Sequence, residues 1–235
     1  METGTEYGGP LAVVAASAEV LRHPEADERL LTDLERARAA RFRREASRLD
    51  FIAAHLLVRL CAARVLGTAA AGLTLAQNCP DCGRGDHGKP YLPDHPDVHV
   101  SLSHTKGVVA AAAGHRLVGI DVELPTRDGN PPEVFERVLT EGELRQVEQH
   151  DDPQRAFLRQ WVRKEALVKV GRATLDGMRE VDLSGLPLTA VDGSPLRSRF
   201  EDLHLLDWDD EQRGATVAVV AADPPSLATA AVLGA

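Results

Sequence analysis

The order in which strand-like and helix-like segments alternate along the chain is the strongest constraint on how it can fold. Residues 11–17, LAVVAAS, form a short apolar run that indicates a buried strand, and helical patterns follow it. Residues 98–104, VHVSLSH, alternate apolar and polar side chains, as a half-buried strand does. Further strand-like, helical and strand-like segments complete the chain. This repeated succession predicts an α+β fold in which two similar halves pack together.

Three segments carry helical patterns that are strong enough for individual predictions. Residues 51–67, FIAAHLLVRLCAARVLG, place their apolar side chains on one stripe, and Gly67 is suited to ending the helix. Residues 131–149 and 152–171 are each predicted to form one further helix.

The two halves are predicted to meet near residue 117, which gives an N-terminal unit of residues 1–117 and a C-terminal unit of residues 118–235. Residues 107–124 are predicted to form a β-hairpin that turns at Gly114 and His115.

Composition and charge exclude some classes of function. Hydrophobic residues make up 43% of the 235 residues but aromatic residues only 4%, so the core must be built mainly from Ala, Leu and Val. The net charge of −9 argues against a general nucleic-acid-binding protein, which is normally basic. Residues 36–48 are nevertheless rich in arginine. They form either a solvated helix face or a local site for phosphates or an acidic partner.

Cellular location is predicted from what the sequence contains. The first residues, METGTEYGGP, lack the pattern of a secretory signal, and no run approaches the roughly 20 apolar residues of a membrane helix. The three cysteines are Cys61, Cys79 and Cys82, an odd number that favours a reduced compartment. We therefore expect a cytoplasmic protein that does not enter a membrane.

The segment GIDVE places two carboxylates close together. Residues two apart on a strand point to the same face, so Asp121 and Glu123 are predicted to lie side by side. Two like charges at this separation are costly unless a cation or water screens them. Hard oxygen ligands suit Mg²⁺ or Mn²⁺. The alternative interpretation is an exposed strand face without a metal.

The segment WVRKEALVK, residues 161–169, adds a third carboxylate. Trp161, Glu165 and Lys169 follow one another at intervals of four, so they lie near one face of a helix. Glu165 could complete a magnesium site, and Lys164 and Lys169 would then meet the charge of substrate phosphates. Without a metal, the simpler interpretation is an intrahelical pair of Glu165 and Lys169, which contributes about 0.2–0.5 kcal/mol.

Two further segments carry charged or titratable candidates. Lys89 lies in HGKPYLP between a glycine and a proline, and His104 lies at the end of the strand-like SLSHT. Either residue taken by itself is more often an ordinary surface or core side chain than a ligand.

Taken together, GKPYLP, VSLSHT, VGIDVE and WVRKEALVK resemble the motifs of the 4′-phosphopantetheinyl transferases, and of their surfactin-synthetase-activating class in particular. They occur in the family's order and approximate spacing over residues 88–169. Each motif by itself is weak evidence, but the ordered set is specific. The resemblance implies a pseudo-dimer of two α+β halves with the active site in the cleft between them.

The resemblance also implies a reaction. Members of this family transfer the 4′-phosphopantetheine arm of coenzyme A to a serine of an apo acyl or peptidyl carrier protein, and adenosine 3′,5′-bisphosphate leaves. Mg²⁺ bridges the pyrophosphate of the coenzyme. The carrier can belong to a fatty-acid, polyketide or nonribosomal-peptide system, including secondary metabolism, and a pseudo-dimer can work as a monomer.

Residue roles follow from matching motifs. Asp121, Glu123 and Glu165 correspond to the acidic metal site, and Glu165 is also the candidate base toward the serine hydroxyl. Lys169 would stabilise the leaving phosphate, and Lys164 would hold the coenzyme's phosphates.

The remaining cofactor-binding positions follow in the same way. His104 corresponds to the contact with the 3′-phosphate region, and Lys89 lies near the adenine. The arginine-rich segment aligns less cleanly because Leu49 stands where an arginine is expected. Arg48 is the preferred candidate there, ahead of Arg44 and Arg41.

The segment CPDC raises a separate question. Cys79 and Cys82 have the spacing of half a zinc site, and His87 and His95 are nearby in the sequence. Since structural zinc normally has four ligands, we expect a reduced, uncoordinated pair of cysteines.

Two other functions are compatible with parts of this pattern. A non-catalytic protein that binds carriers or coenzyme A is one alternative, although such a copy would be expected to have lost one of the acidic or basic residues. An unrelated Mg²⁺-dependent phosphoryl enzyme is the other.

Overall fold

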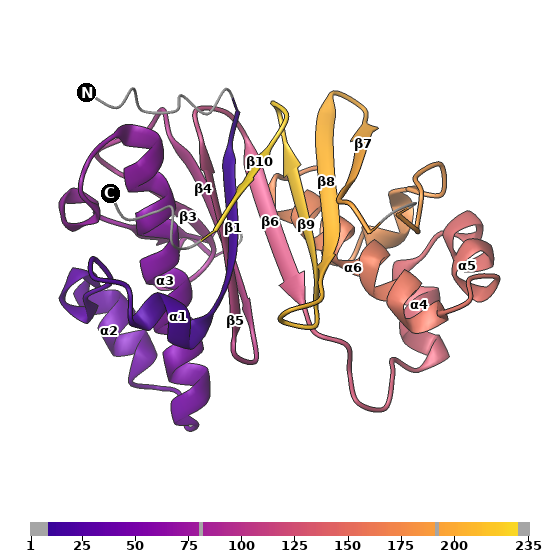
Figure 1. The fold of residues 1–235 in the computed structure, drawn as a ribbon, viewed down its shortest axis with the longest axis horizontal. Coiled ribbons are helices and arrows are strands. Elements are labelled where there is room, and N and C mark those ends of the chain that lie inside the picture. Colours follow the sequence, from indigo (N-terminus) through magenta and orange to yellow (C-terminus); the bar gives the residue numbers. More distant parts are fainter. Residues whose placement is uncertain (1–8, 80–81, 191–192, 230–235) are drawn as a thin grey trace.

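The computed structural model describes residues 9–79, 82–190 and 193–229. Within them, two four-stranded sheets lie side by side at the centre of the molecule (Figure 1). The strands are β1 (Leu11–Ala16), β2 (Ala76–Asn78), β3 (Lys89–Tyr91), β4 (His99–Thr105), β5 (Val108–Gly114), β6 (Val118–Glu123), β7 (Leu196–Phe200), β8 (Leu203–Asp210), β9 (Ala215–Ala221) and β10 (Ser226–Ala228).

Helices lie on the outer side of each sheet. The α-helices are α1 (Ser17–Leu21), α2 (Asp33–Ala39), α3 (Glu45–Leu66), α4 (Pro132–Val138), α5 (Glu141–Glu148) and α6 (Pro153–Lys169), and the short 3₁₀ turns are Glu28–Leu30, Ala70–Gly72 and Met178–Glu180. None of the helices in the described part of the chain is both long and apolar enough to cross a membrane.

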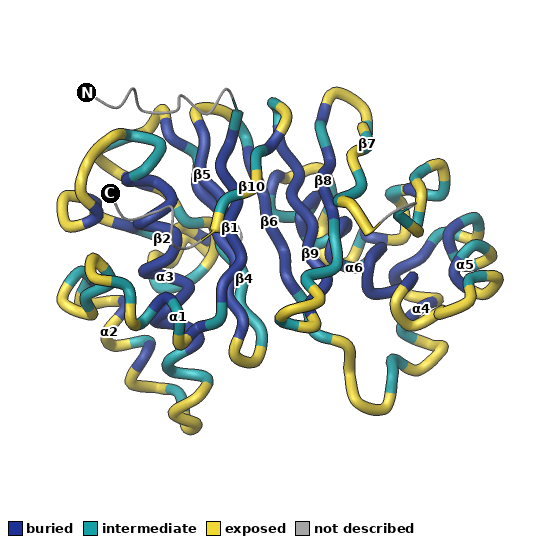
Figure 2. Tube along the Cα trace, in the orientation of Figure 1, coloured by how far each residue is buried: buried dark blue, intermediate teal, exposed yellow. Residues whose placement is uncertain are grey.

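The sheets and long helices stack in four layers. One sheet has the order β10-β1-β5-β4 and the other the order β6-β9-β8-β7. Helix α3 packs on the outer face of the first sheet, and α6 packs on the outer face of the second. The inner faces of the two sheets form a separate apolar cluster of mainly Ala and Val, which is why the buried segments are concentrated along the central strands (Figure 2).

The predicted α+β fold with two similar halves is confirmed, since each half combines a four-stranded, mainly antiparallel sheet with a long outer helix. The division at residue 117 stays a prediction. The residues that follow Pro224, for which no secondary structure is predicted, supply β10, which pairs in parallel with β1 of the other half.

The predicted hairpin over residues 107–124 is wrong. Strand β5 pairs with β4 on one edge and with β1 on the other, so neither edge remains for β6. Strand β6 pairs instead with β9 in the second sheet. The turn at Gly114 and His115 therefore carries the chain from one sheet to the other.

The helix predictions are correct in kind but differ at their boundaries. Helix α3 begins six residues before the predicted position 51, and Gly67 ends it with a left-handed φ of 63°. The stretch 131–149 forms two helices because Thr140 begins α5 with a capping box, in which its hydroxyl and the Glu143 carboxylate bond each other's backbone N–H groups.

Gly119 explains how α6 can lie so close to β6. A Cβ atom at this position would stand 2.6 Å from the carbonyl oxygen of Ala166 and 2.9 Å from Cγ1 of Val170. The backbone of α6 therefore occupies the space that any larger residue would need. This close approach brings the C-terminal half of α6, with Glu165 and Lys169, to the first strand of the second sheet.

We expect Gly119→Ala to lower the free energy of unfolding by about 1–3 kcal/mol, because the methyl group overpacks the contact between α6 and β6. Urea denaturation followed by circular dichroism measures the change. Gly185→Ala is the matched control, since a Cβ at that exposed position meets nothing within 4 Å, and its change should stay within about 0.5 kcal/mol. Equal stability of the two variants would contradict the assigned packing role.

Candidate active site

The two halves are joined along β4 and β6 by the serines of the VSLSHT segment. The hydroxyl of Ser101 accepts a hydrogen bond from the backbone N–H of Ile120 at 3.1 Å, and the hydroxyl of Ser103 donates to Oδ1 of Asp121 at 2.7 Å. Both serines point from β4 toward β6, as their spacing of two residues requires. They therefore fix where the first carboxylate of GIDVE lies.

Lys169 connects the same two strands through its ammonium group. Its Nζ donates to the carbonyl of Leu102 at 3.2 Å, to the carbonyl of Ile120 at 2.7 Å and to Oδ1 of Asp121 at 2.8 Å. The carbonyls belong to β4 and β6 respectively, and the lysine is the last residue of α6. The ammonium group thus links α6 to β4 in the first sheet and to β6 in the second.

Three carboxylates converge on this point. Asp121 is only 3% exposed, and Glu123 and Glu165 are half-buried. Burial, followed by the charges of Asp121 and Glu165, raises the pKa of Glu123 to about 7. Burial and the charge of Asp121 likewise raise the pKa of Glu165. The carboxylates are therefore close enough to repel one another, and Lys169 only partly compensates for that repulsion.

The donor set fits a hard divalent cation. Oδ2 of Asp121 is buried and has no hydrogen-bond partner among the described residues. A buried oxygen of this kind is normally satisfied, so it is available as a ligand. Among the described residues, no choice of one carboxylate oxygen from each of these three acids places all three within 4.8 Å of one another. The group is therefore an oxygen-rich site that is looser than a closed metal cage.

A hollow of about 340 Å³ lies beside Lys169. Lys89 on β3 and the β4 segment from Val100 to Leu102 form one wall, and the C-terminal end of α6 forms the other. Elements of both halves thus line it. The structure brings together Lys89 and Lys169, which lie 80 residues apart in the sequence, around one space with both apolar and charged walls.

His104 lies on the other side of this arrangement, against the N-terminal half. Its ring stands edge-on to Phe51 with centroids 6.4 Å apart. Burial above all, then the charges of His55, Arg38 and Lys169, lowers the pKa of His104, although Asp50 opposes the shift. The positive charges of Lys169 and of Arg38 on α2 both act on this histidine.

Arg38, the arginine of α2, is not among the site residues that the sequence predicts. Arg38 stacks over the Phe51 ring at 5.2 Å from its centroid and donates to the carbonyl of Asp86 at 3.1 Å. Together with Arg41 and Phe42 it lines a second hollow, of about 280 Å³. The arginine-rich composition of residues 36–48 was the available signal, but it does not distinguish among the arginines.

A buried ionic network holds Arg38 in place by anchoring α2 to α3. Glu35 accepts from Arg59 at 2.6 Å and 2.9 Å, and its Oε1 lies 2.6 Å from Nδ1 of His55. Burial by itself would raise the pKa of Glu35, but the bonds to His55 and Arg59 outweigh it and lower the pKa to about 2. Glu35 is thus charged and paired at neutral pH, one helical turn before Arg38.

Comparison with known proteins agrees with this arrangement. Residues 117–220 match the 4′-phosphopantetheinyl transferase superfamily. A stretch of 116 residues is also 29% identical to a 4′-phosphopantetheinyl transferase of Bacillus subtilis. That stretch covers 48% of each chain, so the similarity spans about half the length of this curated relative. The family resemblance predicted from the motifs is confirmed at this level. The segment that matches the superfamily, residues 117–220, contains Asp121, Glu123 and all of α6.

Lys164 does not occupy the position that the phosphopantetheinyl transferase motif suggested. Its side chain is fully buried, and its ammonium donates to Glu143 at 2.6 Å. Three carbonyls, of Val138, Met178 and Val181, accept from the same group at 2.8–2.9 Å. The expected role of holding coenzyme phosphates is therefore corrected. In this structure Lys164 links α6 to the end of α4, to α5 and to residues 178–181.

Arg48 also lies away from the converging residues. Its guanidinium donates twice to Glu45 at 2.9 Å and pairs with Glu28 at 3.6 Å. Within the described part of the chain it lines neither of the two hollows. The preference for Arg48 is thus not supported, because its charge is already neutralised on the surface. Arg38 and Arg41, by contrast, line the second hollow.

We expect Lys164→Met to lower the free energy of unfolding by about 3–5 kcal/mol, because it leaves the buried Glu143 without its cation. Denaturant unfolding measures the loss. The double variant Lys164→Met with Glu143→Leu should recover part of it, since neither charge then remains buried. If Lys164→Met is as stable as the wild type and only weakens coenzyme A binding, the structural assignment is wrong.

Proposed function

We propose that this protein transfers 4′-phosphopantetheine from coenzyme A to a serine of an apo carrier protein, releasing adenosine 3′,5′-bisphosphate, and that it is of the surfactin-synthetase-activating class. The observation that carries the proposal is the convergence of Asp121, Glu123, Glu165 and Lys169 beside a hollow that Lys89 also lines. The superfamily match over residues 117–220 supports it.

The acidic cluster would hold Mg²⁺, with Mn²⁺ as an alternative. Asp121, Glu123 and Glu165 offer hard oxygen ligands, and the raised pKa values of both glutamates indicate negative charge that still requires compensation. When bound, the ion would neutralise the pyrophosphate of coenzyme A and polarise the phosphorus under attack.

Glu165 is the proposed proton acceptor. The serine oxygen of the carrier forms a bond to the β-phosphorus of coenzyme A, and the bond from that phosphorus to the leaving bisphosphate breaks. The serine proton passes to the Glu165 carboxylate, directly or through water. Its raised pKa makes the carboxylate a better proton acceptor than an ordinary glutamate.

Lys169 is placed to stabilise the charge that develops on the leaving phosphate. Its ammonium is held by two carbonyls and by Asp121, so it is oriented before substrate arrives. Because three acceptors already surround it, the lysine acts through its fixed charge and not as a mobile side chain.

The nucleotide end of coenzyme A would occupy the basic and aromatic side of the site. Lys89 lines the hollow beside Lys169, and His104 and Arg38 lie near Phe51. Arg38 and Arg41, in place of Arg48, are the proposed contacts to the 3′-phosphate. Arginine offers a planar set of donors that suits phosphate oxygens.

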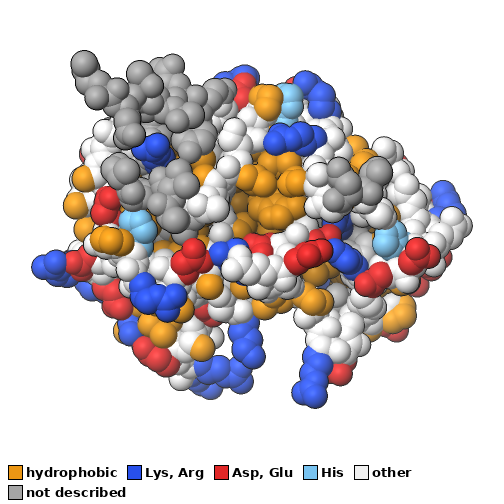
Figure 3. All heavy atoms as spheres, viewed as in Figure 1, with side chains coloured by type: hydrophobic (Ala, Val, Ile, Leu, Met, Phe, Trp, Pro, Cys, Tyr) orange, Lys and Arg blue, Asp and Glu red, His pale blue; other side chains and the backbone are white. Residues whose placement is uncertain are grey.

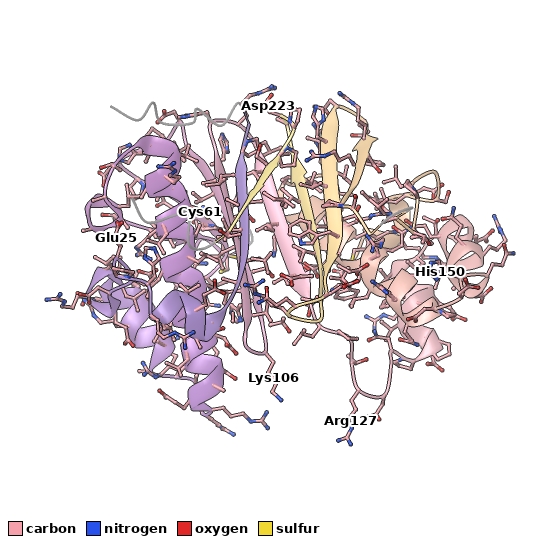
Figure 4. All side chains as sticks on the ribbon, viewed as in Figure 1. Glu25, Cys61, Lys106, Arg127, His150 and Asp223 are labelled. Carbon is pink, nitrogen blue, oxygen red and sulfur yellow. The ribbon has the colours of Figure 1, made fainter. Side chains whose placement is uncertain are left out.

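The carrier protein would approach the edge where the halves part. Lys106 in the β4–β5 turn and Arg127 in the loop after β6 both project from this edge (Figure 4). Figure 3 shows a notch between two protruding basic side chains there. Carrier proteins are acidic, so these basic tips would favour encounter although the chain carries a net charge of −9. We further propose that the enzyme works as a monomer in the cytoplasm.

Incubation with coenzyme A, Mg²⁺ and a panel of apo carrier proteins tests the proposal. We expect intact-mass spectrometry to show carriers that have gained one phosphopantetheine arm. If no carrier gains mass while a known transferase modifies the same panel in parallel, the proposal fails. Cleavage of coenzyme A without any acceptor would instead favour an unrelated phosphoryl enzyme.

Glu165→Gln should reduce the rate of transfer by at least about 100-fold, because it removes both a metal ligand and the proton acceptor. Glutamine has nearly the same volume and carries no charge to be repelled by Asp121, so the thermal unfolding temperature should not fall. Stopped-time mass spectrometry of the carrier gives the rate. A variant that folds normally and retains near-wild-type turnover would remove Glu165 from the mechanism.

Lys89→Ala should raise the KM for coenzyme A about tenfold with a smaller change in kcat, because its charge contacts the bound nucleotide and not the reacting atoms. The matched control is Arg116→Ala, an exposed basic residue paired with Asp223 that lines neither hollow among the described residues. A lowered kcat with an unchanged KM would contradict the assignment.

A further inference from the structure

The loop before Lys89 brings together three soft metal ligands. Single ligand atoms of Cys79, Cys82 and His87 all lie within 4.8 Å of one another. Sγ of Cys82 is 3.3 Å from Nε2 of His87. The sequence predicts an uncoordinated cysteine pair, because the spacing of Cys79 and Cys82 does not show whether a histidine reaches the two thiols.

Backbone hydrogen bonds connect Cys79 to the residues that follow Cys82. The N–H of Cys79 donates to the carbonyl of Arg84 at 2.9 Å, and the N–H of Gly83 donates to the carbonyl of Cys79 at 2.9 Å. Gly83 has a φ of 69°, a left-handed conformation that favours glycine. The chain therefore folds back on itself immediately after Cys82, with both thiols on the same short segment.

A second glycine brings the histidine to this turn. Gly88 has a φ of 98°, and a Cβ there would stand 2.5 Å from Cα of Cys79 and 2.3 Å from the carbonyl oxygen of Asn78. The backbone at residue 88 thus lies directly against the backbone at residues 78–79. His87, one residue earlier, is consequently held beside Cys79 although eight positions separate them in the sequence.

A carboxylate fixes the histidine in the form that a metal requires. Nδ1 of His87 lies 2.7 Å from Oδ1 of Asp86. A proton on Nδ1 makes this hydrogen bond and leaves the lone pair on Nε2, the atom that faces Cys82. Metal-bound histidines commonly donate their other ring N–H to a carboxylate in this way.

We propose that Cys79, Cys82 and His87 bind Zn²⁺, with water in the fourth position. Two thiolates and an imidazole are donors that zinc prefers over Mg²⁺. Tetrahedral zinc with Zn–S of about 2.3 Å and Zn–N of about 2.0 Å places neighbouring sulfur and nitrogen ligands roughly 3.5 Å apart. The observed 3.3 Å separation of Sγ and Nε2 is close to that value.

The zinc site would stabilise the wall between the two hollows. Asp86 and His87 line the hollow of Arg38 and Arg41, whereas Gly88 and Lys89 line the hollow beside Lys169. The carbonyl of Asp86 also accepts from Arg38. A metal at His87 would therefore hold the backbone from which both walls are built. Any effect on coenzyme A binding rests on the proposed function, whereas metal binding does not.

Metal analysis of the purified full chain tests the site. Protein prepared under reducing conditions with zinc present, then dialysed against metal-free buffer, should retain about one equivalent of zinc. Cys82→Ser and His87→Ala should each retain less than about a tenth of that amount. His95→Ala is the matched control, because this histidine lies close in sequence but outside the cluster, and it should retain zinc as the wild type does.

Cobalt provides a second readout on the wild type, so the test does not depend on the variants folding. Replacement of zinc by Co²⁺ should produce a thiolate-to-metal charge-transfer band that Cys82→Ser weakens or removes. Zinc should also slow the reaction of two of the three thiols with a disulfide reagent. Wild-type protein without bound zinc, without the cobalt band and without thiol protection would overturn the proposal, as would equal zinc retention in every variant.

The outcome is separable from that of the proposed function. A protein that binds zinc but modifies no carrier retains the metal site and loses the transferase assignment. If the protein modifies carriers but binds no zinc, the transferase assignment stands and the zinc site is refuted. If both hold, removal of zinc should raise the KM for coenzyme A more than it lowers kcat.

Discussion

The ammonium group of Lys169 is the interaction on which the arrangement of the site depends. It donates to a carbonyl from each half and to the carboxylate of Asp121. The two sheets pack through Ala and Val side chains, which fill space without specifying a particular alignment of the strands. Directional bonds from Lys169 and the serines of β4 supply that alignment, and they bring the acidic residues to the boundary between the halves.

Without a bound cation, the three carboxylates of the acidic cluster repel one another. Three carboxylates share one partly buried region. Burial and the negative charge of Asp121 raise the pKa of both Glu123 and Glu165. One lysine cannot neutralise three negative charges. A divalent cation would reduce this repulsion, so the same arrangement that weakens the fold at neutral pH would strengthen cation binding.

Two lysines of one helix show the limit of motif reasoning. Lys164 and Lys169 lie five residues apart, which separates them by about 140° around a helix of 3.6 residues per turn. The former is therefore directed into the contact with α5, and the latter toward β4 and β6. The motif assigned phosphate contacts to both. Only the packing of neighbouring elements decides which lysine is buried, and the same holds for Arg38 and Arg48.

The sequence by itself determined the α+β class, the helix that ends at Gly67 and the placement of Asp121 and Glu123 on one face of a strand, because local periodicity carries that information. The tertiary structure decided the separation of β5 from β6, the burial of Lys164, the approach of Arg38 to Phe51 and the meeting of His87 with two cysteines. Each of these depends on contacts between segments distant in the chain, and no local pattern specifies such contacts.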